Sequence, residues 1–328
     1  MMKRVLFLTF VSILFLGISY CDDKKNQPTW TDPEKAAAED PSFMIQGEYG
    51  VAEEGQDWAI QVVALGDNKL DGYVLEGGFP GLGFVKGNQK IKLSGELKDG
   101  VATLAGGEFT GRIADGQFIL KKGEAVVGTY PRMVRQSPTI GKKAPEGAVI
   151  LFDGTNADAW DKEDLVENGL LKNTDISTKQ KFGSYHLHLE FRTPYKPFAR
   201  GQARGNSGVY HQGRYETQVL DAFGLEGKMN ETGGLYSIKA PDLNMCLPPL
   251  EWQTYDVDLT SAEFDEAGNM TKPGKITARL NGFLIHDNVD LPKPTPGNKT
   301  KFNGEPGPIF IQGHGNPVFY RNIWLVEK

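Results

Sequence analysis

The feature that most constrains the fold is a succession of short runs in which apolar and polar residues alternate, separated by turn signals. Residues 185–192 alternate strictly between two faces, as side chains along a strand do. Residues 275–287 form a hairpin pattern around Asn281-Gly282, a pair that favours a two-residue turn. No amphipathic helix longer than about two turns is evident. The chain is therefore predicted to be an all-β protein built from antiparallel strands.

The strand-like runs fall into two groups, which predict two domains. Residues 42–136 alternate between short runs and turns and predict a small antiparallel β domain that contains no His or Cys. Residues 137–147 contain two prolines and two glycines and are interpreted as a linker. Residues 148–328 show stronger strand patterns, and their many strands without helices predict a two-sheet sandwich of the jelly-roll type.

The amino terminus has the pattern of a secretory signal. Lys3 and Arg4 precede an apolar run over residues 5–19. This run is shorter than the roughly 20 apolar residues that a permanent membrane-spanning helix needs. Residues 1–20 are therefore predicted to be a signal peptide, and the mature protein is expected in a bacterial cell envelope, periplasmic or extracellular.

Cys21 follows this signal directly, and residues 18–21 resemble the lipobox of bacterial lipoproteins. Tyr20 departs from that pattern, because a small residue usually stands there; plain export is the alternative. Lipidation of Cys21 would make the membrane a partner through an amino-terminal lipid anchor. Residues 21–41 are polar and contain three prolines, so they are interpreted as a tether.

Composition excludes some classes of partner and restricts the sources of stability. A formal net charge of −6 leaves no basic footprint for nucleic acid, and no nucleic-acid partner is expected. The 40 glycines and a hydrophobic fraction of 39% suit a turn-rich β protein. If Cys21 is lipidated, Cys246 has no partner for a disulfide within the chain. Stability must then come from burial of a core.

The stretch from Gly205 to Asp221 predicts a loop, a strand, a tight turn at Gly213 and a second strand. Along the second strand Glu216 and Gln218 project from one side, because side chains of a strand alternate between its faces. A carboxylate and an amide side by side on a sheet surface suit a sugar or metal site better than a core. This stretch therefore carries the first candidate site residues.

Several motifs recur together in the second half of the chain. They are Leu151–Thr155, Leu187–Arg192, Asn206–Asp221, Gly233–Tyr236, Glu251–Asp256, Gln312–Gly315 and Arg321–Trp324. In this order and spacing they resemble the 3-keto-disaccharide hydrolase family over about residues 148–328. The resemblance implies a concanavalin A-like jelly roll, a carbohydrate or glycoside ligand, and cleavage of 3-keto-glycosides.

Two positions depart from what the resemblance implies. Thr232 stands where many relatives have Cys, so a partner that Cys246 might have had is missing. Asn316 stands where relatives often carry a second His after the His-Gly pair. These departures keep open the alternative of an envelope scaffold that has lost its activity.

The implied reaction defines the residue types that a site would need. A ketone at carbon 3 acidifies the hydrogen on carbon 2; a base removes it, the group at carbon 1 leaves, and water adds. The route needs a base whose pKa is near neutral, an electrophile or metal for the enolate oxygen, and an acid for the leaving group.

Glu216, His314 and Glu190 are the acid–base candidates. The predicted substrate-binding residues are Asn206, Tyr210, Gln218, Asp221, Trp252, Gln312, Arg192 and Arg321. Glu190, Glu216 and His314 could also gather a divalent metal ion from distant strands, although no local metal motif appears. No other cofactor is expected.

Several of these residues have structural alternatives. Glu190 and Arg192 could simply pair across a sheet surface, and Arg321 could be a structural, carboxylate-paired arginine. Trp252 could belong to the core or to the lip of a site. Asp221 has the opposite strand parity to Glu216 unless a bulge intervenes, so it could cap the following turn.

Two further functions compete with the enzyme. A carbohydrate-binding module is possible on the same fold, since fold alone does not determine function. A conventional glycosidase needs two carboxyl groups, and the amide of Gln218 stands in the second acidic position of the comparable strand. The enzyme hypothesis requires that Glu216, Gln218 and His314 converge in one pocket.

Overall fold

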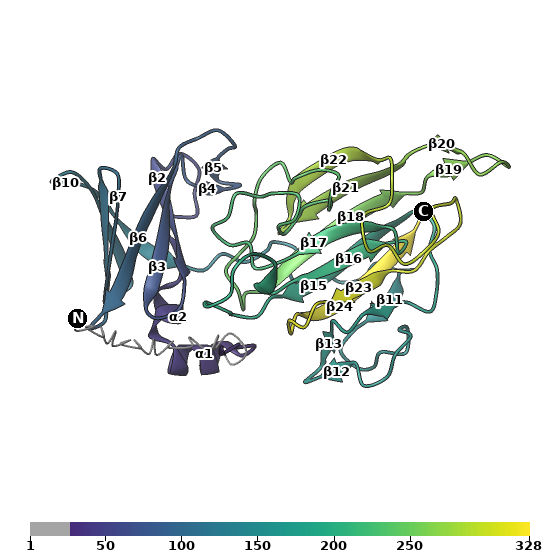
Figure 1. The fold of residues 1–328 in the computed structure, drawn as a ribbon, viewed down its shortest axis with the longest axis horizontal. Helices are drawn as coiled ribbons and strands as arrows, with labels where there is room; N and C mark the ends of the chain where they lie inside the picture. The colour runs from purple at the N-terminus through teal and green to yellow at the C-terminus, as the bar shows by residue number, and fades with distance from the viewer. Residues whose placement is uncertain (1–26) are drawn as a thin grey trace, which may run out of the picture.

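A computed structural model describes residues 27–328 of the chain (Figure 1). The predicted signal peptide and the lipidation of Cys21 lie outside the described residues. Nearly all regular structure consists of antiparallel strands, which confirms the all-β prediction. Within residues 27–328, no helix combines the length and the apolar character needed to cross a membrane.

The amino-terminal domain is a closed antiparallel barrel, drawn in purple and blue in Figure 1. Around the barrel the strands are β1 (Gly47–Tyr49), β10 (Ala125–Met133), β9 (Gln117–Lys122), β8 (Phe109–Ala114), β7 (Val101–Gly106), β6 (Lys90–Lys98), β3 (Lys69–Glu76) and β2 (Trp58–Ala64). A short parallel pair, β4 (Phe79–Pro80) and β5 (Gly83–Phe84), lies beside it. Alternate residues such as Leu93, Leu104 and Phe118 fill the interior of the barrel. Because the barrel is closed, this sheet has no edge strand with unpaired backbone groups.

The carboxyl-terminal domain is a sandwich of two antiparallel sheets. The large sheet consists of β12 (Val166–Glu167), β13 (Leu170–Lys172), β24 (Phe319–Glu327), β15 (Tyr185–Arg192), β18 (Gln253–Thr260), β21 (Gly274–Leu280) and β22 (Phe283–Leu291), with β11 (Val149–Phe152) also paired to β24. The small sheet consists of β14 (Ile176–Ser177), β23 (Phe310–Gly313), β16 (Ser207–His211) and β17 (Tyr215–Val219). A hairpin of β19 (Glu263–Phe264) and β20 (Met270–Lys272) extends from the sandwich (Figure 1).

Strand alternation decides which side chains enter the core of the sandwich. On β17, Tyr215 and Val219 belong to the core between the sheets, which leaves Glu216 on the outer face of the small sheet. On β15, Leu189 and Phe191 belong to the same core, which leaves Glu190 on the outer face of the large sheet. The two glutamates therefore lie on opposite outer faces of the sandwich.

The described part of the predicted tether is folded onto the protein, so the tether interpretation of residues 21–41 is wrong for residues 27–41. Helices α1 (Pro33–Glu39) and α2 (Pro41–Ile45) begin at the capping residues Asp32 and Asp40, each followed by a proline. Trp30 is 6% exposed, and its backbone pairs with that of Tyr195 in the sandwich. Burial of one aromatic residue thus joins the segment to the sandwich.

The segment predicted as a linker, residues 137–147, makes specific contacts with the outer face of the large sheet. The hydroxyl groups of Ser137 and Thr139 lie 2.6 and 2.7 Å from that of Thr254. Lys142 forms an ion pair of 2.8 Å with Asp256. We call residues 137–143 the strap, because these bonds hold them across the sheet.

Candidate functional site

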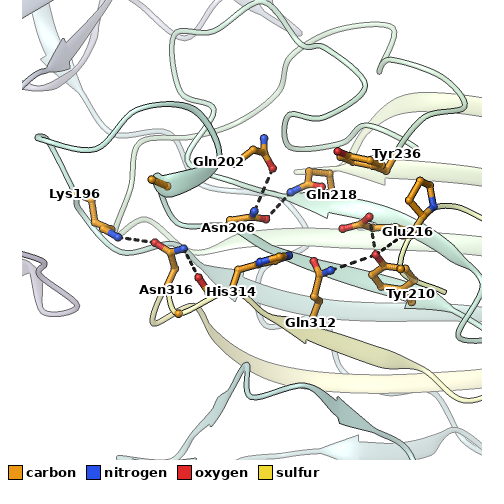
Figure 2. Close-up of a pocket in the computed structure, with 14 residues that line it drawn as sticks. Lys196, Gln202, Asn206, Tyr210, Glu216, Gln218, Tyr236, Gln312, His314 and Asn316 are labelled. Atoms are coloured by element: carbon orange, nitrogen blue, oxygen red, sulfur yellow. Dashed lines mark hydrogen bonds between the residues drawn. The ribbon is translucent and has the colours of Figure 1, made fainter. Parts of the chain in front are cut away.

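The candidate site is a cavity of about 670 Å³ over the outer face of the small sheet. Figure 2 shows side chains from β16, β17 and β23 on its floor, with loop residues around them. The 14 residues that line it are Lys196, Gln202, Ala203, Asn206, Tyr210, Glu216, Gln218, Tyr236, Pro296, Gly297, Gln312, His314, Gly315 and Asn316. Most of them are polar, as expected of a site that binds hydroxyl groups.

Glu216 lies on the floor of this cavity and is only 3% exposed. Tyr210 donates a hydrogen bond of 2.9 Å to its carboxylate. Burial raises the pKa of Glu216 to about 7, and the bond from Tyr210 opposes only part of that rise. The carboxylate crosses the neighbouring strand at Gly208, where any side chain would overlap it. Glu216 can thus accept or release a proton near neutral pH.

A row of amides forms one wall of the cavity. Gln218 donates a hydrogen bond of 2.8 Å to the side-chain oxygen of Asn206, and Asn206 donates one of 3.1 Å to Gln202 (Figure 2). Gln218 and Asn206 are almost fully buried, so their orientation is restrained by these bonds. Oriented amides can donate to and accept from sugar hydroxyl groups.

His314 lies at the exposed end of the cavity, next to Gln312 (Figure 2). Gln312 donates to the hydroxyl oxygen of Tyr210 over 3.3 Å. Asn316 accepts a hydrogen bond of 2.6 Å from Lys196 and donates one of 3.0 Å to the backbone carbonyl of His314. Asn316, noted above as a departure, therefore fixes the loop that carries His314.

Six of the residues predicted from the sequence share this cavity: Asn206, Tyr210, Glu216, Gln218, Gln312 and His314. Sequence reasoning missed Lys196, Gln202 and Tyr236. Tyr236 stands in one of the motifs that carry the resemblance, which was an available signal. Lys196 stands in an irregular segment and Gln202 in the short 3-10 helix η2 (Gly201–Ala203), where no strand parity indicates a direction.

Four predicted residues do not belong to the cavity, and their prediction as part of one site with Glu216 is wrong. Arg321 forms an ion pair of 2.6 Å with Glu190, and its guanidinium lies 4.0 Å from the ring centroid of Trp252. The guanidinium of Arg192 also lies over this ring, 4.9 Å from the same centroid. The physical reason is that β15 and β24 belong to the large sheet, whose outer face points away from Glu216.

Glu190 is 1% exposed and is saturated with partners. Gly141 of the strap and Asn322 both donate to its Oε1, over 2.6 and 2.9 Å. Burial would raise its pKa, but hydrogen bonds from His188, Asn322 and Arg321 outweigh burial and lower the pKa to about 2. Such a carboxylate stays ionised and suits an anchor for the strap rather than an acid or base.

Asp221 was predicted to bind substrate, and the structure does not place it among the residues that line the cavity. It is buried and forms an ion pair of 2.6 Å with Arg204. Its carboxylate also accepts a hydrogen bond of 3.3 Å from the backbone amide of Phe223. This bond corresponds to the turn-capping role that was given above as the structural alternative for Asp221.

The predicted metal ligands do not meet, because Glu190 lies on the opposite face of the sandwich from Glu216 and His314. No group of three or more His, Cys, Asp or Glu residues among residues 27–328 is placed to hold a metal ion.

Comparisons with known proteins place the sandwich in a family. A structure from Parabacteroides distasonis, provisionally assigned as a glycosyl hydrolase, is 33% identical and has a TM-score of 0.53; the match covers 56% of this chain and 85% of that one. A second structure from the same organism, with the same provisional assignment, is 21% identical, with a TM-score of 0.40 over 56% of this chain and 94% of that one. No curated protein matches. Residues 147–326, more than half of the chain, match the 3-keto-α-glucoside-1,2-lyase-like domain, and the chain belongs to this family.

Proposed function

We propose that this protein cleaves the glycosidic bond of 3-keto-glycosides by removing a proton next to the ketone. The observation that carries the proposal is Glu216, a single buried carboxylate whose pKa is raised to about 7 on the floor of a polar cavity. Family membership and the similarity to a provisionally assigned glycosyl hydrolase support glycoside cleavage in general. The finer mechanism follows from the side chains.

In the first step the carboxylate of Glu216 takes the proton from carbon 2 of the sugar, and the bonding electrons form an enolate with the carbonyl at carbon 3. The amide of Gln312, which lines the cavity and donates to one protein partner, is a donor that can stabilise the enolate oxygen. The enolate collapses to a double bond between carbons 1 and 2, the ketone re-forms, and the bond from carbon 1 to the leaving oxygen breaks. That oxygen takes a proton, which we assign to His314.

Water then adds to carbon 1 and gives its proton to His314, which regains its acid form, and carbon 2 is protonated again by Glu216, now in its acid form. The sum is hydrolysis, and no oxidant or reductant is consumed. Glu216 exchanges its proton with the solvent between the two steps, and a base that must first take and then give a proton has to titrate near the working pH, which is the range to which burial brings Glu216.

The cavity argues against a conventional glycosidase. Such enzymes use two carboxyl groups on either side of the scissile bond. Among the 14 residues that line the cavity, Glu216 is the one carboxylate. Elimination next to a ketone needs one base and one acid, roles for which the cavity offers Glu216 and His314.

The test is an incubation of the protein with a 3-keto-glucoside in deuterated water, followed by mass spectrometry and NMR of the sugar. We expect release of the aglycone and one deuterium at carbon 2, while the unoxidised glucoside stays intact. Equal cleavage of the unoxidised glucoside would contradict the mechanism. Binding of the keto-sugar without turnover would instead indicate a carbohydrate-binding module.

The role of His314 is tested with two leaving groups. Removing a general acid matters most when the leaving oxygen is basic, so His314→Ala should slow release of an alkyl alcohol by about 100-fold. Release of a nitrophenol should change little. His186→Ala, on the opposite face of the sandwich, is the matched control. Equal losses with both leaving groups would remove His314 from this role.

A further inference from the structure

Two loops of the sandwich carry part of the cavity wall, and both rest on the amino-terminal barrel. We call residues 196–206 the first loop and residues 222–236 the second loop. The first carries Lys196, Gln202 and Asn206, and the second carries Tyr236. Figure 1 shows the barrel and the sandwich side by side, with irregular segments of the sandwich between them.

The first loop contacts the turn between β2 and β3 of the barrel. Arg200 donates a hydrogen bond of 2.7 Å to the carbonyl of Leu65, and Arg204 donates one of 3.3 Å to that of Ala64. The ring of Phe198 packs over Gly66, where any side chain would overlap it. The turn thus supports the first loop by charged hydrogen bonds and close packing.

The second loop is held by Lys90 of β6. Its ammonium group donates to the carbonyls of Gly224 and Leu225 over 2.9 and 2.8 Å, and forms an ion pair of 2.9 Å with Glu226. The same group lies 4.8 Å from the ring centroid of Tyr73. Its side chain is only 14% exposed, so these bonds are formed largely away from water.

The middle of the second loop lies beside open space. Residues 225–230 and Lys90 line a second cavity, of about 480 Å³, between the barrel and the sandwich. A segment beside such a cavity has fewer apolar contacts to fix it, so its polar bonds matter more for its position. Asn244 of the sandwich donates to the carbonyls of Ala222 and Leu225, and Lys90 supplies the corresponding bonds from the barrel.

The two loops join each other and then the floor of the candidate site. Gln202 of the first loop donates a hydrogen bond of 2.7 Å to the carbonyl of Asn230 in the second. The same Gln202 accepts from Asn206, which accepts from Gln218 beside Glu216. A continuous path of contacts therefore runs from the barrel through both loops to the amide row.

We propose that the barrel is a brace for the active site, and that Lys90 is a positioning residue that acts through the second loop on the amide row. The family match begins at residue 147, so the barrel lies outside it. The proposal rests on the proposed function where its test measures KM, but not where the test measures hydrogen exchange of the second loop.

The experiment compares Lys90→Met with Lys98→Met in the mature chain. Lys98 is exposed and lies on the same strand, so its replacement controls for loss of a barrel charge. We expect Lys90→Met to raise KM for a 3-keto-glucoside by about tenfold, the size of one lost charged hydrogen bond, because Lys90 acts on the site indirectly; the change in kcat should be smaller. Lys90→Arg should restore most of the loss.

Hydrogen exchange gives a second readout that needs no activity. In Lys90→Met, amides of residues 222–236 should exchange faster, while those of the core strand β15 stay unchanged. If Lys90→Met folds poorly, Arg200→Met takes its place. It removes a hydrogen bond from the first loop to the barrel, and we expect it to raise KM to a similar extent. Unchanged KM and unchanged exchange would overturn the brace, and so would uniformly faster exchange over the whole chain. A wild type without turnover would refute the proposed function, and exchange would still decide the brace.

Discussion

Two buried glutamates on the two outer faces of one sandwich have opposite properties. Glu216 and Glu190 are 3% and 1% exposed, and each stands in mid-strand on the face away from the core. Glu216 has one side-chain hydrogen bond, from Tyr210, and its pKa is raised to about 7 by burial. Glu190 has an arginine, an asparagine and a backbone amide as partners, and its pKa is lowered to about 2.

The difference teaches that burial alone does not mark a catalytic carboxylate. Burial raises the pKa of both groups, and the number and charge of the partners decide the net direction. A carboxylate left short of partners beside an open cavity can exchange protons, whereas a saturated one under the strap holds structure together. Each prediction below tests one side of this contrast.

The largest effect is expected for Glu216→Gln. Gln keeps the shape but cannot take a proton, so kcat on a 3-keto-glucoside should fall by about 10²–10⁴-fold. Thermal unfolding should show a protein at least as stable as the wild type at pH 8, because an unfavourable buried charge is removed. Retention of kcat within a factor of about three would exclude Glu216 as the base.

Glu190→Ala should lower the stability of the protein and leave its activity nearly unchanged. It leaves Arg321 without its partner and frees the backbone amide of Gly141, so we expect a loss of about 3 kcal/mol in the free energy of unfolding. Turnover per folded molecule should stay near that of the wild type. Urea unfolding measures the first quantity, and an activity assay below the transition measures the second. A large loss of kcat in a fully folded variant would place Glu190 in the site after all.

The pH dependence of stability should differ in sign between the two glutamates. The folded pKa of Glu216, about 7, is above its ordinary value of 4.5, so its protonated form favours folding, and this contribution is lost as pH rises from 4.5 to 7. The unfolding free energy of the wild type relative to Glu216→Gln should fall over that range by on the order of 3 kcal/mol. Glu190, with a folded pKa of about 2, should lose its contribution only as pH falls below 4.5. A difference between the proteins that does not vary with pH would contradict the assignment for Glu216.

The smallest effect is expected for Tyr210→Phe. The hydrogen bond from Tyr210 lowers the pKa of Glu216, so its removal should raise that pKa further. Activity depends on the carboxylate form, so the midpoint of the rising limb of the pH–rate profile should move up by on the order of one pH unit. A profile with the wild-type midpoint would show that this bond does not tune the base.

Local pattern predicted much of the sandwich, because strand parity is a local property. The alternation of residues 215–219 correctly placed Glu216 and Gln218 on the face opposite Tyr215 and Val219. Parity failed where strands are irregular. In a regular strand Arg321 and Ile323 would share a face, but Asn322 has a φ of 45° and the register of β24 against β15 shifts near it. Ile323 lies in the core, whereas Arg321 pairs with Glu190, which is the structural alternative given for it above.

Residues outside strands were predicted least well. Residues 27–41 and 137–147 have compositions typical of a tether and a linker, yet Trp30 is buried against Tyr195 and Gly141 donates to Glu190. Composition describes what a segment can bury by itself, whereas these segments are ordered by surfaces that distant parts of the chain supply. No pattern within either segment indicates that such a surface exists.

The amino-acid sequence by itself determined the all-β class, the two groups of strands, and the parity that pairs Glu216 with Gln218. Only the tertiary structure decided that His314 joins these residues while Glu190 is separated from them by the whole core of the sandwich. The physical reason is that alternation assigns a side chain to a face of its own strand, while the face becomes a cavity or a covered surface only when distant segments pack over it.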